Sequence, residues 1–344
     1  MKKANNMNLK TIADRAGVST ATVSNVINGN HHKVSKETTE RVMSIIEELN
    51  YAPNAAARSL VSDRSRIIAL LVPNMMLEGG FGVDPYASAM ISLLELLIQK
   101  EGYYTMVRSV NRALDITQLV YTWHVDGIII LGAYPDEARE ISSQIKDIPL
   151  VYTDTYSSQI PIANIGIDDY KGGYLSASYL LKKGHRKICF VGPDEKISAV
   201  ISERCRGFRA ALQEYGLKLD PEDIYTGDTS IDAGAALGKQ IAASPKTYTA
   251  IAAMSDTLAL GICGSLHECG LAIPDDISII GFDDIKACAF TNPRLTSIHQ
   301  DLDKKAFLVC KHLFEMIRTR KAYSINEVLD VRVAERKSVK EPGR

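Results

Sequence analysis

The chain has little surplus charge and no long hydrophobic run. Its 344 residues carry 40 Lys and Arg against 41 Asp and Glu, a formal net charge of −1. No apolar run reaches the roughly 20 residues that span a bilayer, and the first thirty residues lack the apolar core of a signal peptide. We therefore expect no membrane contact and a cytoplasmic location. The charge alone argues against nucleic-acid binding, because such proteins neutralise phosphates with excess Lys and Arg.

The sequence also lacks the usual signatures of metal sites and enzymes. Its six cysteines form no C-x-x-C pair and have no His at zinc-ligand spacing, so reduced thiols are expected. No G-x-S-x-G, Walker loop or G-x-G-x-x-G occurs. Pairs of adjacent acidic residues at 168–169, 275–276 and 283–284 are compatible with a glycosidase, because that reaction uses two carboxylates. Adjacent acids are, however, typical of strand ends and helix starts. We expect no enzyme and no cofactor or metal.

Between residues 8 and 50, apolar residues recur at helical spacing in three short groups. Gly17 provides a tight break after the first group, Ser19 is a suitable N-cap for the second, and Ser35 opens the third. This pattern predicts three short helices and no strand. A connector over residues 51–66 follows, and its Ala-rich stretch is too short to form a stable helix alone.

From Ile67 onward, short runs typical of β-strands alternate with amphipathic stretches. This alternation predicts parallel sheets with helices on both faces. The zone holds roughly 270 residues, which exceeds one comfortable sheet. We therefore expect an α/β architecture of two lobes, each a doubly wound parallel sheet, facing a cleft. The predicted strands are 67–73, 103–109, 125–132, 150–154, 188–192, 250–254 and 277–283, and the predicted helices include 85–100, 170–183, 206–215 and 257–269.

Residues 9–28 read LKTIADRAGVSTATVSNVIN, and this segment resembles the helix-turn-helix of the LacI/GalR family of transcription regulators. The resemblance continues into the ARSL of residues 57–60, which is similar to that family's hinge helix. It extends through GHRKI, PDDIS, GFD and LTSIHQ in the second half of the chain. The resemblance implies a helix-turn-helix DNA-binding domain at 1–50, a hinge helix and linker at 51–66, and a two-lobed effector-binding and dimerisation domain, similar to periplasmic binding proteins, at 67–344.

The second predicted helix supplies candidate DNA contacts. Its short polar side chains and one methyl group suit the major groove. By resemblance, Thr20, Ala21 and Asn25 match base-reading positions, and Ser19, Thr22 and Ser24 match positions that face phosphates. In the hinge, the leucine at 60 matches the residue that wedges between base pairs in the minor groove. The candidate DNA-binding residues are Ser19, Thr20, Ala21, Thr22, Ser24, Asn25, Asn54, Ala57, Arg58 and Leu60.

Polar residues near the ends of predicted strands are candidates for an effector site, because ligands of α/β lobes bind at the carboxyl ends of strands. An arginine fork with carboxylates suits a polyhydroxyl ligand, which favours a sugar-like effector. Tyr86 either stacks on a ligand ring or packs within its own lobe. By resemblance, Arg204, Asp256 and Asp283 hydrogen-bond the effector. The full candidate set is Asn74, Asp154, Arg204, Asp256, Asp283 and Gln300.

These features predict a sequence-specific transcriptional regulator, a repressor, whose operator affinity is controlled by a small, sugar-like effector. One head offers too few contacts for specific binding, so we expect a homodimer on a pseudopalindromic operator in double-stranded DNA. The alternatives are a solute-binding receptor without a DNA role and a carbohydrate-active enzyme. Up to Leu60 basic residues outnumber acidic ones, so the neutral total averages a basic head and an acidic remainder.

Overall fold

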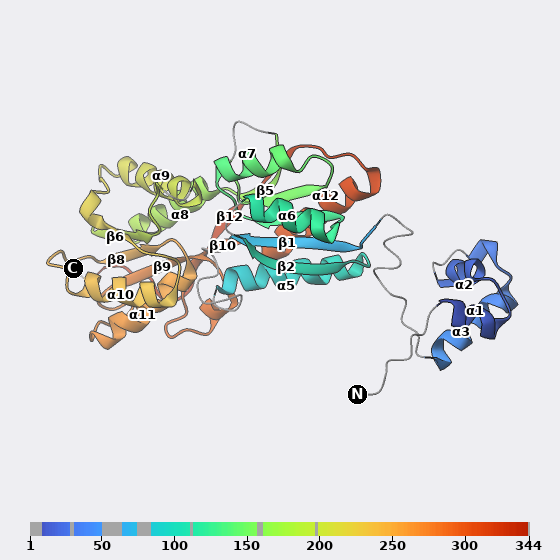
Figure 1. Cartoon of the computed structure of the whole chain (residues 1–344). Helices are drawn as coiled ribbons and strands as arrows, with labels where there is room; N and C mark the ends of the chain where they lie inside the picture. The colour runs from blue at the N-terminus through green and yellow to red at the C-terminus, as the bar shows by residue number, and fades with distance from the viewer. Residues whose placement is uncertain are drawn as a thin grey trace. The chain divides into compact units, whose positions relative to one another are not determined.

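The computed structural model describes residues 9–27, 31–49, 64–73, 84–110, 113–156, 161–196 and 199–342 (Figure 1). The chain divides into two compact units, Met1–Ser65 and Arg66–Arg344. Among these described residues, no helix is both long and apolar enough to cross a membrane.

The first unit is a small helical bundle. Gly17 ends the first helix with a φ of +64°, a backbone conformation that glycine adopts without steric cost. The Ser19 hydroxyl accepts a hydrogen bond from the Thr22 N–H (3.1 Å), and the Ser35 hydroxyl caps the third helix through Thr38 (3.3 Å). The predicted helices and caps are confirmed. The elements are α1 (Leu9–Ala16), α2 (Thr20–Ile27), the 3-10 turn η1 (His31–Lys33) and α3 (Lys36–Glu48).

The second unit begins with a lobe built on a six-stranded sheet of order β11-β5-β4-β3-β1-β2, which we call the N-lobe. Alternate residues of β1 point to opposite faces, so Ile68 and Leu70 pack with α5 and α12, whereas Ala69 and Leu71 pack with α6 and α7. The elements are β1 (Ile67–Pro73), α5 (Pro85–Lys100), β2 (Tyr104–Val110), α6 (Ala113–Trp123), β3 (Gly127–Leu131), α7 (Pro135–Gln144), β4 (Leu150–Thr153), β5 (Ala163–Ile167), α12 (Leu302–Thr319) and β11 (Ile325–Leu329).

The other lobe, the C-lobe, has a sheet of order β12-β10-β9-β8-β6-β7. Helices α8 and α9 cover one face, and α10 and α11 cover the other. One strand departs from the predicted parallel arrangement, because β12 runs antiparallel to β10. The elements are α8 (Asp169–Lys182), β6 (Ile188–Gly192), α9 (Ala199–Glu214), η3 (Pro221–Asp223), β7 (Ile224–Thr226), α10 (Ile231–Ala242), β8 (Ala250–Ala253), α11 (Asp256–Glu268), β9 (Ser278–Asp283), η4 (Lys286–Ala289), β10 (Thr296–Gln300) and β12 (Val331–Ala334).

The chain passes between the lobes where β5 leads into α8, where β10 leads into α12, and where β11 leads into β12. Polar residues stand at the first two crossings: Asp169 begins α8, and Gln300 ends β10. These crossings place residues from both lobes beside one another.

Candidate DNA-binding and effector sites

Helix α2 presents a polar face over a buried apolar one. Val23 and Val26 are buried in the core of the first unit. Thr20 and Ala21 are exposed, whereas Thr22 and Asn25 are only half-buried. The predicted exposed face is thus open at its N-terminal end and partly covered further on. This is the end of a recognition helix that contacts base edges in helix-turn-helix proteins.

Other predicted site residues fall outside the described residues. They are Asn74 and four residues of the predicted hinge: Asn54, Ala57, Arg58 and Leu60.

Close packing of α8 on α9 positions the first polar group between the lobes. A Cβ on Gly173 would collide with the backbone carbonyl oxygen of Arg204, and one on Gly207 with that of Tyr170. Only glycine allows the two helices to approach this closely. The approach brings the side chain of Arg204 on α9 against Asp169 at the start of α8.

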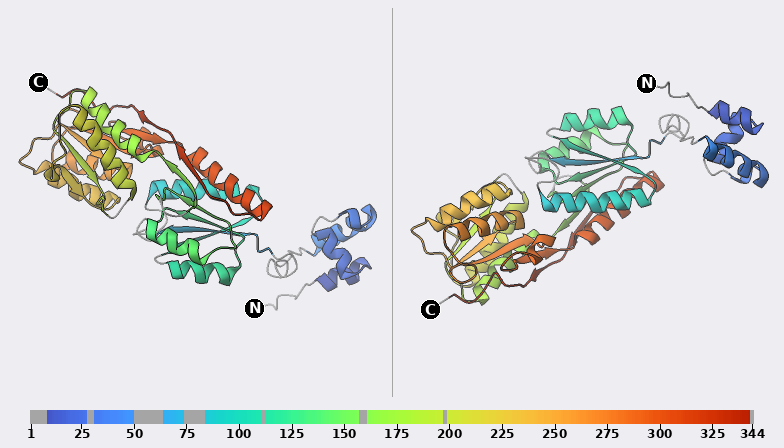
Figure 2. Two further views of the ribbon diagram at one scale, coloured as in Figure 1. Left: turned by 90° about the horizontal axis from the view of Figure 1, so that it is seen from above. Right: turned by 90° about the horizontal axis from the view of Figure 1, so that it is seen from below.

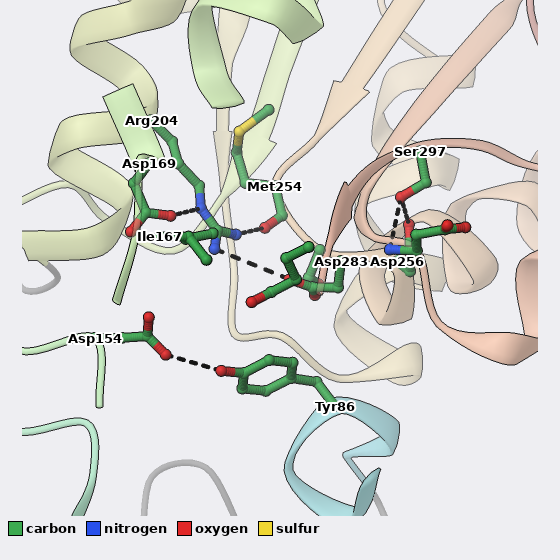
Figure 3. A network of polar contacts seen from close by, with 12 residues as sticks. Tyr86, Asp154, Ile167, Asp169, Arg204, Met254, Asp256, Asp283 and Ser297 are labelled. Carbon is green, nitrogen blue, oxygen red and sulfur yellow. Dashed lines mark hydrogen bonds and ion pairs between the residues drawn. The ribbon is translucent and has the colours of Figure 1, made fainter. Parts of the chain in front are cut away.

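Arg204 is buried, and its guanidinium is held on several sides (Figure 3). Its Nε donates to Asp169 Oδ1 (2.7 Å), and its Nη1 donates to the carbonyl oxygen of Met254 (2.6 Å). Its Nη2 lies 3.9 Å from Asp283 Oδ1, and the guanidinium lies 3.5 Å above the Phe282 ring. A buried guanidinium held in this way is fixed in orientation before any ligand arrives.

The carboxyls around Arg204 are buried with it. Burial raises the pKa of Asp169, and Arg204 only partly offsets that rise. The pKa of Asp283 is raised well above its usual value by burial, again against the lowering effect of Arg204. The Tyr156 hydroxyl donates to Asp169 Oδ2 (2.6 Å), which ties the N-lobe to the start of α8.

A second set of contacts extends from Asp283 back to the N-lobe. Gln300 Nε2 donates to Asp283 Oδ1 (2.7 Å), and Gln300 Oε1 accepts from Lys305 Nζ (2.8 Å). Lys305 also pairs with Asp154 Oδ1 (2.9 Å), whose Oδ2 accepts from the Tyr86 hydroxyl (2.8 Å). Tyr86 therefore points into this group rather than only packing within its lobe. We call the whole set the interlobe network: Tyr86, Asp154, Tyr156, Asp169, Arg204, Asp283, Gln300 and Lys305.

Two aspartates of the network have an uncommon backbone conformation. Asp154 follows β4 with a φ of +47°, and Asp283 ends β9 with a φ of +107°. Positive φ is uncommon for residues other than glycine, although Asp and Asn adopt it more readily than most, and such residues are concentrated at functional sites. One such carboxylate lies at the carboxyl end of a strand in each lobe, which is where α/β folds bind ligands.

Asp256 lies beside the network but is fully engaged elsewhere. Its Oδ1 accepts from the Ser297 hydroxyl (2.7 Å), its Oδ2 accepts from the Ile285 N–H (2.9 Å), and the residue has no exposed surface. Figure 3 shows Asp256 and Ser297 apart from Arg204. The arrangement disfavours direct contact of Asp256 with an effector, because both oxygens already hold C-lobe elements together.

The raised pKa of Asp256 should make the free energy of unfolding depend on pH. Burial raises its pKa to about 6, against the lowering effect of the Ser297 hydrogen bond. Between pH 4 and 6 the folded state then binds more protons than the unfolded state, so Asp256 makes stability fall as pH rises. Relative to Asp256→Asn, the unfolding free energy of the wild type should drop by at most about 3 kcal/mol over that interval. Urea denaturation at several pH values measures this difference, and a rise would contradict the assignment.

Four members of the network lie outside the predicted candidate set, and of these only Tyr86 was considered as a ligand contact. Lys305 is wholly buried on α12, and Asp169 and Tyr156 also contribute. The sequence carries a signal for Lys305, because it lies at helical spacing with Leu308 and Val309 on the buried stripe of α12. A charged residue on such a stripe indicates a buried ion pair.

A cavity of about 640 Å³ borders the network on the N-lobe side. Asp154 and Tyr156 line it, together with Asn164 and Gly166 of β5 and Asn326 of β11. Arg204 and Asp283 do not line it, so the cavity adjoins the network rather than containing it.

A helix-turn-helix unit and a two-lobed α/β unit with polar groups converging between its lobes define the class of ligand-responsive DNA-binding regulators. Two family models match the chain: bacterial regulatory proteins of the lacI family at residues 8–54, and the periplasmic binding protein-like domain at residues 177–339. The HTH-type transcriptional repressor PurR of Vibrio vulnificus is 35% identical over 318 residues, 91% of each chain.

Solved structures agree with this match. A lac repressor dimer bound to operator and the anti-inducer ONPF covers 98% of this chain and 100% of its own, with a TM-score of 0.85 and 26% identity. A LacI-family regulator from Enterococcus faecium with bound ribose has a TM-score of 0.71 and 26% identity, covering 80% of this chain and 100% of its own. The chain belongs to the LacI family.

The chain is thus a transcriptional repressor of this family with an effector-binding domain similar to periplasmic binding proteins, and it binds operator DNA and a small-molecule effector. The predicted fold class, family and regulatory function are confirmed. Its relatives are repressors rather than enzymes, and a receptor without a DNA role does not account for the lacI-family match at residues 8–54.

Proposed function

We propose that the chain acts in the cytoplasm as a homodimer on a pseudopalindromic operator, and that an effector held by Arg204 and Asp283 sets its operator affinity. Residues 1–50 read DNA, residues 51–66 connect, and residues 67–344 bind the effector and dimerise. The observation that carries the effector part is the buried Arg204 guanidinium facing Asp283, a carboxylate at positive φ at the end of β9.

The DNA contacts are assigned to α2, where Thr20 and Ala21 are exposed and Asn25 is half-buried. An asparagine amide pairs with a base edge through two hydrogen bonds. Asn25→Ala should therefore weaken operator binding by about 1–3 kcal/mol and relax preference at one base pair. Fluorescence anisotropy with operator variants measures this, and Ser44→Ala on the exposed face of α3 is the control. An equal loss on operator and random DNA would contradict base reading by Asn25.

A homodimer is supported by exposed apolar side chains on both lobes of the second unit. Leu96 on α5, Tyr104 at the start of β2 and Ile231 on α10 are exposed. Helices α5, α10 and α11 lie at the bottom of Figure 1 and face the viewer in the right-hand view of Figure 2. Exposed apolar side chains carried by both lobes suit burial against a second copy. The lac repressor structure similar to this chain is a dimer.

The effector is proposed to be small and rich in hydrogen-bonding groups. The sequence favours a sugar, and one structural relative binds ribose. Relatedness to PurR favours a purine base instead. An arginine fork and a carboxylate suit both, because they offer donors and acceptors side by side.

A thermal-shift screen of the wild type with ribose, cellobiose, adenine, guanine and hypoxanthine separates these classes. Bound ligand raises the melting temperature by mass action. Asp283→Asn should weaken the binding of the active ligand by about 10- to 100-fold, since a hydrogen bond to a charged group contributes about 1.5–3 kcal/mol. Asp275→Asn, on the surface of the same lobe, is the control. Undiminished binding by Asp283→Asn would refute the assigned site.

A further inference from the structure

Lys305 is a lysine with no exposed surface, placed in the middle of the interlobe network. Its Nζ lies 2.9 and 3.0 Å from the two carboxylate oxygens of Asp154, 2.8 Å from Gln300 Oε1 and 3.2 Å from the Tyr86 hydroxyl. A buried charge is tolerated only when it is paired and hydrogen-bonded. These oxygens satisfy that requirement.

The number and type of these acceptors match an ammonium ion. Its three protons meet three acceptor groups: the Asp154 carboxylate, the Gln300 amide oxygen and the Tyr86 hydroxyl. The Gln300 amide is oriented by its neighbours, because its nitrogen must face Asp283 and its oxygen must face Lys305. The pKa of Tyr86 is raised well above its usual value by burial and then by Asp154, so the phenol stays protonated and donates to that carboxylate.

We propose that Asp154, Gln300 and Tyr86 form an ammonium-binding subsite that Lys305 occupies as a tethered cation, and that Lys305 thereby limits which effectors bind. Because the Lys305 ammonium already occupies the subsite at Asp154, a ligand between the lobes is limited to contacts with Arg204 and Asp283. This selectivity role rests on the proposed function. It also removes Asp154 from the residues expected to contact the effector.

Chemical rescue tests the subsite without operator or effector. Lys305→Ala should lower the melting temperature by roughly 5–15 °C, because it leaves the half-buried Asp154 without its cation. n-Propylammonium replaces the missing carbons and the ammonium group, so it should raise the melting temperature of Lys305→Ala saturably, by at least about 2 °C. 1-Propanol, which has the same chain without the charge, should have no such effect. The wild type and Lys304→Ala, an exposed lysine on the same turn, should not respond to the amine.

Rescue by 1-propanol as strong as by the amine, or no rescue by the amine, would overturn the subsite. If Lys305→Ala does not fold, Lys305→Met replaces it, because methionine keeps most of the side-chain volume. Adding Asp154→Asn to Lys305→Met then removes the unpaired negative charge, and asparagine tolerates the positive φ of this position. The double variant should be more stable than Lys305→Met, and equal stability would overturn the proposal. Neither outcome bears on operator binding by the wild type, whose absence would refute the proposed function separately.

Selectivity is tested with two sugars that differ in one ammonium group. The Lys305→Ala protein, in which the subsite is vacated, should gain binding of D-glucosamine relative to D-glucose, whereas the wild type should show no such preference. A preference for glucosamine in the wild type, or none in Lys305→Ala, would contradict the role of Lys305 as a limit on effector choice.

Discussion

Arg204→Met should lower the free energy of unfolding of the second unit by about 3–5 kcal/mol, because it leaves buried carboxylates without their cation. The guanidinium pairs directly with Asp169 and faces Asp283, and all three residues are buried. Methionine keeps most of the side-chain volume, so the loss reports charge and hydrogen bonding rather than a cavity. Denaturant unfolding followed by circular dichroism measures it.

The matched control is Arg206→Met, two residues along α9. Arg206 is largely exposed and pairs with Glu203 on its own helix, so its loss should cost less than about 1 kcal/mol. The deficit of Arg204→Met should also shrink as pH falls. Without Arg204, the pKa values of Asp169 and Asp283 rise further, and protonation then relieves the unpaired charge. A deficit that is equal at pH 5 and pH 8, or shared by Arg206→Met, would contradict this explanation.

Gly173→Ala should cost about 3 kcal/mol or more and should also abolish effector binding. The new Cβ collides with the backbone carbonyl oxygen of Arg204, so no side-chain rotation relieves the clash. Helix α9 must move away from α8, which separates Arg204 from Asp169. Overpacking of a core contact usually costs about 1–3 kcal/mol, and a clash with backbone lies at the upper end.

The control for Gly173 is Gly264→Ala, also within a helix of the C-lobe. A Cβ on Gly264 in α11 meets nothing within 4 Å. This change should therefore stabilise the protein by up to about 1 kcal/mol, because alanine loses less backbone entropy than glycine in a helix. Thermal unfolding and ligand binding of both variants are the measurements. Normal stability of Gly173→Ala would contradict the close helix approach as the device that positions Arg204.

Local signals predicted much of the fold. The bounds predicted for β1, α5 and β6 are those observed, because Pro85 fixes the start of α5 and each of the two strands is a short hydrophobic run that ends at a Pro or Gly. The strands β5, β7, β10, β11 and β12 were not predicted. Segment 163–167 contains Asn and Gly, and β11 alternates exposed and partly buried residues with a polar pair at its centre. Their strand conformation depends on pairing with distant segments, which no local pattern encodes.

The site was predicted from strand ends and from the family resemblance, and only part of it follows from such signals. Arg204, Asp283, Gln300 and Asp154 meet in one network, whereas Asp256 supports the C-lobe instead. Lys305 and Tyr156 belong to the network because they lie near the crossings between the lobes. The contact of Lys305 with Asp154, for example, is between residues far apart in sequence. A lysine on a helix usually indicates a solvated face, and only its position on the buried stripe indicates otherwise.

Control of operator affinity by a ligand at Arg204 and Asp283 is tested most directly by anisotropy with the full chain and an operator selected from random DNA. The ligand found in the thermal-shift screen should change the operator Kd of the wild type by at least about fivefold, the lower end of typical allosteric coupling. It should leave random-DNA binding unchanged and, at a concentration just sufficient to saturate the wild type, should have a much smaller effect on operator binding by Asp283→Asn. An operator affinity that the bound ligand leaves unchanged, or that it changes equally in Asp283→Asn, would contradict an effector site between the lobes.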